Sequence, residues 1–117
     1  MLRDPRALLW DVADAAGAIA DFVEGRNLSD YLADRMIRSA VERQSIIVGE
    51  ALNRLSKIDP VLAGRIPELP RVVAFRNLLA HGYADVDHES VWRTVTEYRP
   101  GLTRRVEALR LELDAQS

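Results

Sequence analysis

The sequence predicts an all-α protein, an antiparallel up-and-down helical bundle of four main helices plus a short fifth one. Two observations lead to this prediction. Ala, Leu, Arg and Glu, which favour helices, dominate the sequence. Apolar residues recur three or four positions apart over long segments, and no segment shows the apolar–polar alternation of a strand. A chain of 117 residues is long enough for one core, so we expect a single domain over residues 1–117.

The composition narrows the possible functions. The chain contains no cysteine, so it can form neither a disulfide nor a thiolate metal site and has no Cys nucleophile. With two histidines a zinc site is not expected, and we expect no cofactor. No leader-like segment is evident and no apolar run approaches about 18 residues, so we expect a cytoplasmic protein without membrane contact. A net charge of −2 gives no general attraction to nucleic acid, which would need a local cluster of Arg.

The first helix is predicted to start at Asp4-Pro5, because Asp is a good N-cap and Pro is favoured in the first turn. A three-to-four-residue apolar repeat follows as far as Gly25, a natural helix terminator. We expect the aromatic rings of Trp10 and Phe22 to pack in the core.

The second helix is predicted to be long, with Ser29 as its cap, a kink near residues 33–34 and an end near Lys57. Its apolar stripe should consist of Leu32, Met36, Ala40, Ile47, Ala51, Leu52 and Leu55. Gly49 costs a helix about 1 kcal/mol relative to Ala, which suggests that another backbone comes close there. Glu50 either faces water or is buried, and a buried carboxylate would need a partner such as Arg76 or Asn77.

The second half of the chain is predicted to hold shorter elements. Asp59-Pro60 ends the long helix, and residues 61–70 form a loop with one short turn. Three helices should follow: one over residues 71–81 with Leu78 facing inward, one over 88–98 capped by Asp87, and one over 102–113. Gly82 should end the first of these, and Pro100-Gly101 should separate the last two.

The stretch Arg76-Asn77-Leu78-Leu79-Ala80-His81-Gly82-Tyr83 gathers a guanidinium, an amide, an imidazole and a phenol. Arg presents a planar fork of donors suited to phosphate, and His exchanges a proton near neutral pH. Together they suffice for metal-free phosphodiester cleavage, in which His81 deprotonates a ribose 2′-hydroxyl and Arg76 stabilises the charge on the attacked phosphate. DNA lacks that hydroxyl, so the substrate would be RNA. Alternatively, Arg76 forms a structural ion pair and His81 is a core histidine.

Helical geometry constrains how these side chains can meet. Asn77 and His81 are four residues apart and share a helix face, so Asn77 could orient the imidazole. Arg76 and His81 are separated by about 140° around the axis. Either the helix unwinds near Gly82 and brings His81 round, or two copies of the chain build the site across a two-fold axis. We favour the dimer. An RNA groove would also need clustered cations, and the sequence does not place Arg3, Arg71, Arg104 and Arg105 on one face.

The same stretch resembles the Arg–gap–His motif of HEPN-domain ribonucleases, in the extended Arg-Asn-x-x-x-His-x-Tyr form of HepT-like toxins. The segment Ile47 to Ala51, which contains Gly-Glu-Ala, resembles a helix of that family. The family's pattern is also matched by Ile66-Pro67 before the motif, and by Val86-Asp87 followed by Val91-Trp92 after it. The resemblance covers roughly residues 4–113 and implies a HEPN-like helical bundle.

The resemblance further implies a homodimeric, metal-independent endoribonuclease. It would act on an RNA such as tRNA or mRNA as the toxin of a type VII-like toxin–antitoxin pair and leave a 2′,3′-cyclic phosphate. Arg76 and His81 would be catalytic, with Asn77 and Glu50 supporting them. An MntA-like nucleotidyltransferase would be the antitoxin and would silence the toxin by AMPylation of Tyr83. Added AMP would bring bulk and negative charge to the cleft. The alternative is a non-catalytic helical subunit that binds and regulates a minimal nucleotidyltransferase.

Overall fold

The computed structural model describes residues 4–116, including every side chain in that range except that of Tyr83. These residues contain helices and no strand, which confirms the predicted all-α bundle. The elements are α1 (Pro5–Val23), α2 (Leu28–Ala33), α3 (Arg35–Ile58), α4 (Pro60–Ala63), α5 (Leu69–His81), the 3₁₀ turn η1 (Tyr83–Asp85), α6 (His88–Arg93), the π turn η2 (Thr94–Tyr98) and α7 (Arg99–Ala115).

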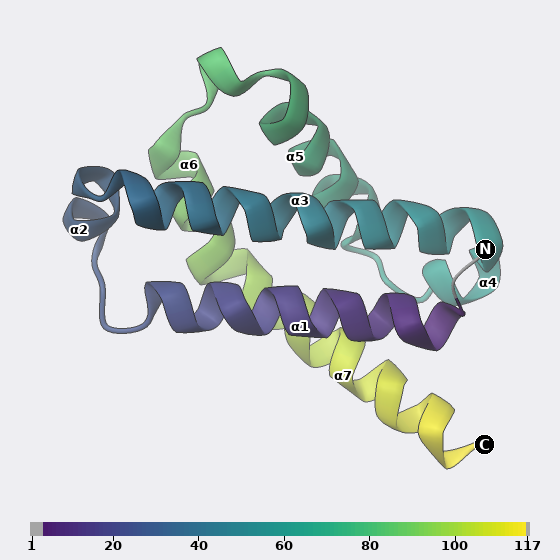
Figure 1. Cartoon of the computed structure of the whole chain (residues 1–117). Coiled ribbons are helices and arrows are strands. Elements are labelled where there is room, and N and C mark those ends of the chain that lie inside the picture. Colours follow the sequence, from purple (N-terminus) through teal and green to yellow (C-terminus); the bar gives the residue numbers. More distant parts are fainter. Residues whose placement is uncertain (1–3, 117) are drawn as a thin grey trace.

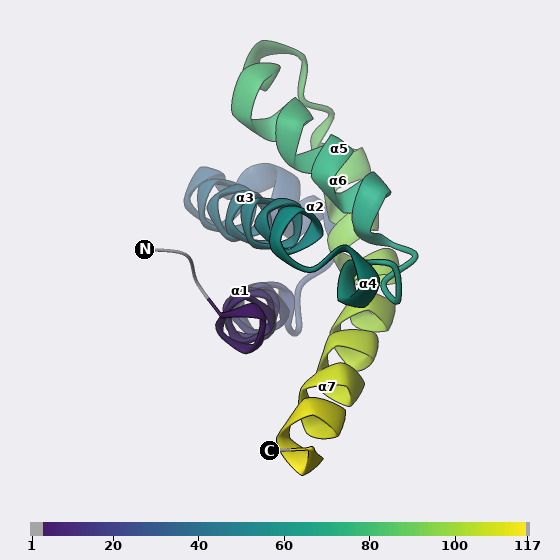
Figure 2. The same ribbon diagram turned by 90° about the vertical axis from the view of Figure 1, so that its right-hand side faces the viewer.

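The long helices α1 and α3 run antiparallel, side by side, and form the centre of the molecule (Figure 1). Helix α5 packs on α3, and α7 packs on α1 and crosses it at an angle. Seen along the axes of α1 and α3, α3 lies between α1 and α5 (Figure 2). The position of α5 on the outer side of α3 is what places the residues of the motif.

Helix α1 begins as the sequence predicts. The carboxylate of Asp4 accepts a hydrogen bond from the backbone N–H of Arg6, and Pro5 occupies the first turn. The helix ends one residue before Glu24, and Gly25 takes a φ of +73°, which Gly adopts without steric cost. Trp10 differs from the prediction: its side chain is 52% exposed, because it lies outside the α1 face that packs on α3 and α7.

The segment predicted as one kinked helix is two helices, α2 and α3. Asn27, rather than Ser29, caps α2, in a reciprocal capping box with Asp30. Asp34 has an extended backbone, with φ −116° and ψ 95°, and its carboxylate accepts a hydrogen bond from the N–H of Ile37. Asp34 therefore caps α3, and this local cap ends one helix where the next begins.

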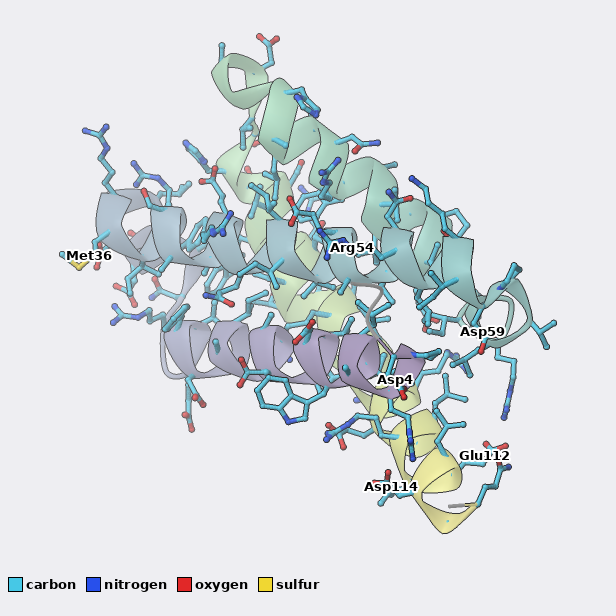
Figure 3. The ribbon with its side chains drawn as sticks, turned by 45° about the vertical axis from the view of Figure 1, so that its right-hand side comes forward. Asp4, Met36, Arg54, Asp59, Glu112 and Asp114 are labelled. Carbon is cyan, nitrogen blue, oxygen red and sulfur yellow. The ribbon has the colours of Figure 1, made fainter. Side chains whose placement is uncertain are left out.

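The core consists of two neighbouring clusters along the helices. One joins α1, α3, α4, α5 and α7 around Leu9, Leu52 and Val106; the other joins α1, α2, α3, α5, α6 and η2 around Tyr31 and Val95. Besides Trp10, three residues predicted to face inward are exposed: Leu32, Met36 and Leu78. Met36 points away from the other helices at the end of α3 (Figure 3), because it lies about 160° around α3 from the buried Leu52 and so outside the face that packs on the other helices.

The C-terminal half departs most from prediction at Pro100-Gly101, which lies within α7 and does not separate two helices. The reason is the π turn η2 directly before it, in which the N–H of Arg99 bonds the carbonyl of Thr94, five residues back. Pro lacks an N–H and its ring collides with the carbonyl four residues earlier in an α-helix. In the wider π turn the carbonyl groups take other positions than in an α-helix, so the ring of Pro100 avoids this collision. Elsewhere α5 starts two residues early, at Leu69, and ends at His81 as predicted.

Within residues 4–116 no helix is both long and apolar enough to cross a lipid bilayer.

Candidate functional site

The site begins with the close approach of α3 and α5 at Gly49. A Cβ placed on Gly49 would lie 2.6 Å from the Cγ of Arg76, nearer still to its Cβ, and 3.4 Å from the carbonyl oxygen of Val72. Only a residue without a side chain allows the stem of Arg76 to lie directly on α3. The expected close contact at Gly49 is therefore present, although it involves the base of a side chain more than a bare backbone.

The guanidinium of Arg76 is held by two neighbours. Its Nη1 donates to Oδ1 of Asn77 at 2.8 Å, and its Nη2 donates to Oε1 of Glu50 at 3.4 Å. The Arg76 side chain is 24% exposed and that of Glu50 is 44% exposed, so the carboxylate is paired yet still in contact with water. The Nε atom of Arg76 is buried and has no hydrogen-bond partner among the described residues. The guanidinium is thus fixed at the surface edge of the α3–α5 contact.

His81 is the last residue of α5, and its side chain is exposed. The helix does not unwind before it, because the N–H of Gly82 still bonds the carbonyl of Leu78 at 2.8 Å. Arg76 and His81 therefore keep the separation of about 140° that five helical residues impose. Within one chain the structure brings together Arg76, Asn77 and Glu50, and it leaves His81 apart from them, without a hydrogen bond or ion pair to any described residue.

Tyr83 lies in the turn η1, two positions beyond His81, and its side chain is outside the described part of the structure. The chain here leaves α5 through Gly82, whose φ of −111° is outside the left-handed region.

A row of cations on α3 was not anticipated from the sequence. Arg43, Arg54 and Lys57 are exposed and are separated from Glu50 by seven, four and seven positions, so they lie on the same helix face as Glu50. None of the three has an ion-pair partner within residues 4–116, and Arg54, in the last third of α3, is labelled in Figure 3. We call Arg43, Arg54 and Lys57 the α3 cation row. The signal that could have revealed it was their heptad-like spacing around Glu50.

The Arg residues considered from sequence lie elsewhere. Arg71 stacks over the ring of Tyr98, with its Cζ 4.3 Å from the ring centroid. Arg105 forms an ion pair with Glu68 at 2.8 Å, and Arg104 is exposed on α7. Arg3 is outside the described residues. Arg71 lies about 140° around α5 from Arg76, so these cations do not form one group at the motif.

In the described part of the chain, no three His, Asp or Glu side chains are grouped in a way that could hold a metal ion.

Comparison with known proteins identifies the family. The family profile described as "Ribonuclease HepT-like" matches residues 12–109. A protein of Methanocaldococcus jannaschii named "Putative RNase MJ1380" is 30% identical over 107 residues, which cover 90% of this chain and 95% of that protein. A protein of Thermococcus cleftensis named "Probable ribonuclease HepT" is 35% identical over 113 residues, covering 94% and 99%. No solved structure matches the chain at a significant level. The resemblance seen in the motif is confirmed, and the chain belongs to the HepT-like ribonuclease family.

Proposed function

We propose that this ribonuclease-family chain is a metal-independent endoribonuclease that acts as the toxin of a toxin–antitoxin pair. The observation that carries the proposal is the state of the motif: a guanidinium fixed by Glu50 and Asn77, and an unpaired, exposed imidazole at the end of the same helix. The guanidinium is positioned to bind a phosphate, and the imidazole is accessible to accept the proton of a hydroxyl.

The reaction would proceed by transfer within the RNA. His81 takes the proton of a ribose 2′-hydroxyl, whose oxygen attacks the adjacent phosphorus. The bond from phosphorus to the 5′-oxygen breaks, and that oxygen receives a proton from a second imidazole or from water. The products are a 2′,3′-cyclic phosphate and a free 5′-hydroxyl. Arg76 stabilises the negative charge that grows on the non-bridging phosphate oxygens.

A two-fold homodimer would bring an Arg76 and a His81 side chain close to each other. Because α5 stays helical through His81, a single chain presents Arg76 and His81 in directions about 140° apart. Two α5 helices facing one another would bring the imidazole of one copy to the guanidinium of the other. Asn77 lies between the two directions and already binds Arg76, so it would position both groups.

The α3 cation row supports RNA as the ligand. Arg43, Arg54 and Lys57 lie on the face of α3 that carries Glu50, beside Arg76, and none of them forms an ion pair with a described carboxylate. Such a row can follow a phosphate backbone in spite of a net charge of −2 for the whole chain. The affinity for RNA should accordingly fall as salt rises.

Regulation would act through Tyr83. An MntA-like nucleotidyltransferase antitoxin would transfer AMP to its hydroxyl, two residues beyond His81. The added phosphate would repel the RNA backbone from Arg76.

The first experiment measures RNA cleavage in EDTA by the wild type and by three variants. His81→Ala and Arg76→Ala should each lose activity by about 10²-fold or more, the usual contribution of a general base or of a group stabilising the transition state. His88→Ala is the matched control, because His88 is the only other histidine and lies on α6, outside the motif. Wild-type protein that cuts neither tRNA nor total RNA, or a His88→Ala loss equal to that of His81→Ala, would refute the assignment.

Toxicity and modification need separate measurements. Expression without the nucleotidyltransferase should stop growth, and His81→Ala should restore it. Co-expression should add AMP-sized mass increments to the peptide that contains Tyr83. A chain that binds the nucleotidyltransferase with or without His81, and is never toxic, would instead be its non-catalytic regulatory subunit.

A further inference from the structure

The α3 cation row forms a straight line of charge on the outer face of α3. Arg43, Arg54 and Lys57 lie within about 60° of one another around the helix axis, at about 100° per residue. The buried Leu52 lies on the opposite side of the helix, so the row faces away from the core. The helical rise of about 1.5 Å per residue makes the row about 21 Å long.

The cations of the row are exposed and unpaired. Within residues 4–116 none of their side chains forms a hydrogen bond or an ion pair. Other exposed guanidinium groups are neutralised: Arg65 pairs with Glu112 at 2.7 Å, and Arg105 pairs with Glu68 at 2.8 Å. The row is therefore a local excess of positive charge that no contact of the fold uses.

This excess is concentrated on one helix. Of the two acidic residues of α3, Glu50 pairs with Arg76, and Oε2 of Glu42 lies 3.9 Å from Nδ1 of His88, so neither pairs with the row. Helix α3 carries five basic and two acidic residues, a net charge of +3, whereas the whole chain carries −2. The rest of the chain therefore carries −5, and an anionic polymer is favoured along α3 over the remaining surface.

Arg76 lies level with the middle of the row. Its Nη2 is 3.4 Å from Oε1 of Glu50, and Glu50 shares the face of the row. Along the helix, Arg43 lies about 10 Å to one side of Glu50. Arg54 and Lys57 lie about 6 and 10 Å to the other side. A strand whose phosphate contacts Arg76 would therefore meet cations of the row in both directions.

The chemistry of this face selects phosphate and not the bases. Guanidinium and ammonium groups contact phosphate oxygens, which carry no sequence information and are the same in RNA and DNA. Base stacking, the other main source of affinity for single strands, needs aromatic rings, and α3 contains none. The straight row also selects a single strand, because each strand of a duplex winds round once in about ten base pairs and leaves a straight line.

We propose that the α3 cation row and Arg76 form a track that binds a single strand by its phosphates alone, so that it holds DNA as well as RNA. A stacked strand advances about 3.4 Å per nucleotide, so about six nucleotides fill the track. The track rests on the proposed function, in which Arg76 contacts the attacked phosphate. The choice of RNA over DNA then arises in the chemical step, from the 2′-hydroxyl that His81 deprotonates, and not in binding. Single-stranded DNA is thus a competitor that stays uncut.

The binding test is fluorescence anisotropy with labelled single-stranded DNA, which contains no 2′-hydroxyl. In about 20 mM salt the affinity of the full chain should rise with DNA length up to about six nucleotides and then level off. The logarithm of the association constant should fall with the logarithm of the salt concentration with a slope of about −2 to −3, the value for three or four phosphate contacts. All-thymine DNA, all-cytosine DNA and, on His81→Ala protein, RNA of the same length should bind within about threefold of one another.

Variants assign the contacts. Arg43→Gln, Arg54→Gln and Lys57→Gln should each weaken DNA binding about tenfold in this salt and make the slope shallower by about 0.7, the effect of losing one phosphate contact. Arg104→Gln is the matched control, because Arg104 is exposed on α7, has no ion-pair partner among the described residues and changes the net charge equally. It should change the affinity by less than about twofold. In cleavage assays, DNA should raise the KM for RNA and leave kcat unchanged.

The track and the ribonuclease assignment fail in different ways. If the protein cuts no RNA but binds DNA with these effects of the row variants, the track stands and the assignment fails. Absence of DNA binding, binding that does not depend on length or salt, or an equal loss for Arg104→Gln would overturn the track. So would RNA binding to His81→Ala that is tighter than DNA binding by about tenfold or more, because the face would then recognise the sugar.

Discussion

Replacing Gly49 by Ala tests the contact on which the Arg76 site is built. Ala is the better helix former by about 1 kcal/mol, so an unobstructed Gly→Ala change inside a helix stabilises it. At Gly49 the new methyl group would lie 2.6 Å from the Cγ of Arg76 and nearer still to its Cβ. The Cβ is held by the backbone of α5 and cannot rotate away.

The expected magnitude follows from the overlap. Carbon atoms in contact are normally separated by about 3.5–4.0 Å, so α5 must move about 1 Å away from α3. A forced shift of this kind in a packed interior costs about 1–3 kcal/mol. After the gain in helix propensity of about 1 kcal/mol is subtracted, we expect Gly49→Ala to lower the free energy of unfolding by up to about 2 kcal/mol. The shift also lengthens the hydrogen bond between Arg76 and Glu50, already 3.4 Å, so RNA cleavage should fall as well.

Urea denaturation followed by circular dichroism at 222 nm measures this free energy. Gly17→Ala is the matched control: Gly17 is within α1, and a Cβ there would have no neighbour within 4 Å. That variant should be more stable than the wild type by about 0.5–1 kcal/mol. If Gly49→Ala stabilises the protein as much as Gly17→Ala does, the inferred packing of Arg76 on α3 is wrong.

Further substitutions test other parts of the structure. Burial, and next to it the charge of Glu42, raises the pKa of Tyr31, so its phenol should stay protonated when absorbance at 295 nm is followed through pH 10. The unfolded chain releases that proton near pH 10, so stability should fall above this pH in the wild type, and Tyr31→Phe should remove this loss. Trp10→Ala should change the free energy of unfolding by less than about 1 kcal/mol, because the side chain is half exposed. Trp92→Ala should cost about 3 kcal/mol in the same urea titration, since its ring packs 5.3 Å from that of Tyr31. The hydroxyl of Ser90 and the N–H of Glu89 hold the pKa of Asp87 below its ordinary 3.8. Asp87 should therefore stabilise α6 fully above that pH and lose this effect as pH falls through the lowered pKa, so the melting temperatures of wild type and Asp87→Asn should converge in acid.

Contradictory outcomes are distinct for each change. Three phenolates formed before unfolding would place the Tyr31 hydroxyl in water. If Trp10→Ala and Trp92→Ala lowered the free energy of unfolding equally, the exposure of Trp10 would not explain its expected smaller effect. A gap between wild type and Asp87→Asn that is constant down to pH 2 would rule out a contribution from the carboxylate charge.

Local signals in the sequence predicted helix starts well. Asp4 and Asp87 each cap the helix that follows, as predicted, because capping depends on neighbours within three residues. Competing local signals were harder to rank. Asn27 and Ser29 are both good caps, and Asn27 prevails because Asp30, three residues later, completes a capping box with it.

Features that depend on packing could not be predicted. The exposure of Trp10 depends on where α7 crosses α1, and Met36 is exposed because it lies on the side of α3 opposite Leu52, which no other helix covers at that end. At the site, the sequence indicated the close contact at Gly49. It also named Arg76 as one of two possible partners of Glu50, and the structure shows that ion pair. The catalytic roles of Arg76 and His81, the AMPylation of Tyr83 and the dimer remain predictions. A single chain cannot display an arrangement that two copies would build.

The π turn at Thr94–Tyr98 has an evolutionary consequence, because a π turn is one residue inserted into an otherwise regular helix. Removing one residue from this segment would return it to ordinary α-helical winding and leave Val91 and Leu102 on their present sides. Removing one residue farther along α7 would instead rotate everything after it by about 100° and turn Leu109 out of the interior. Length changes among related chains should therefore collect at this turn, and a shortened version would have to replace Pro100, which follows the turn in α7.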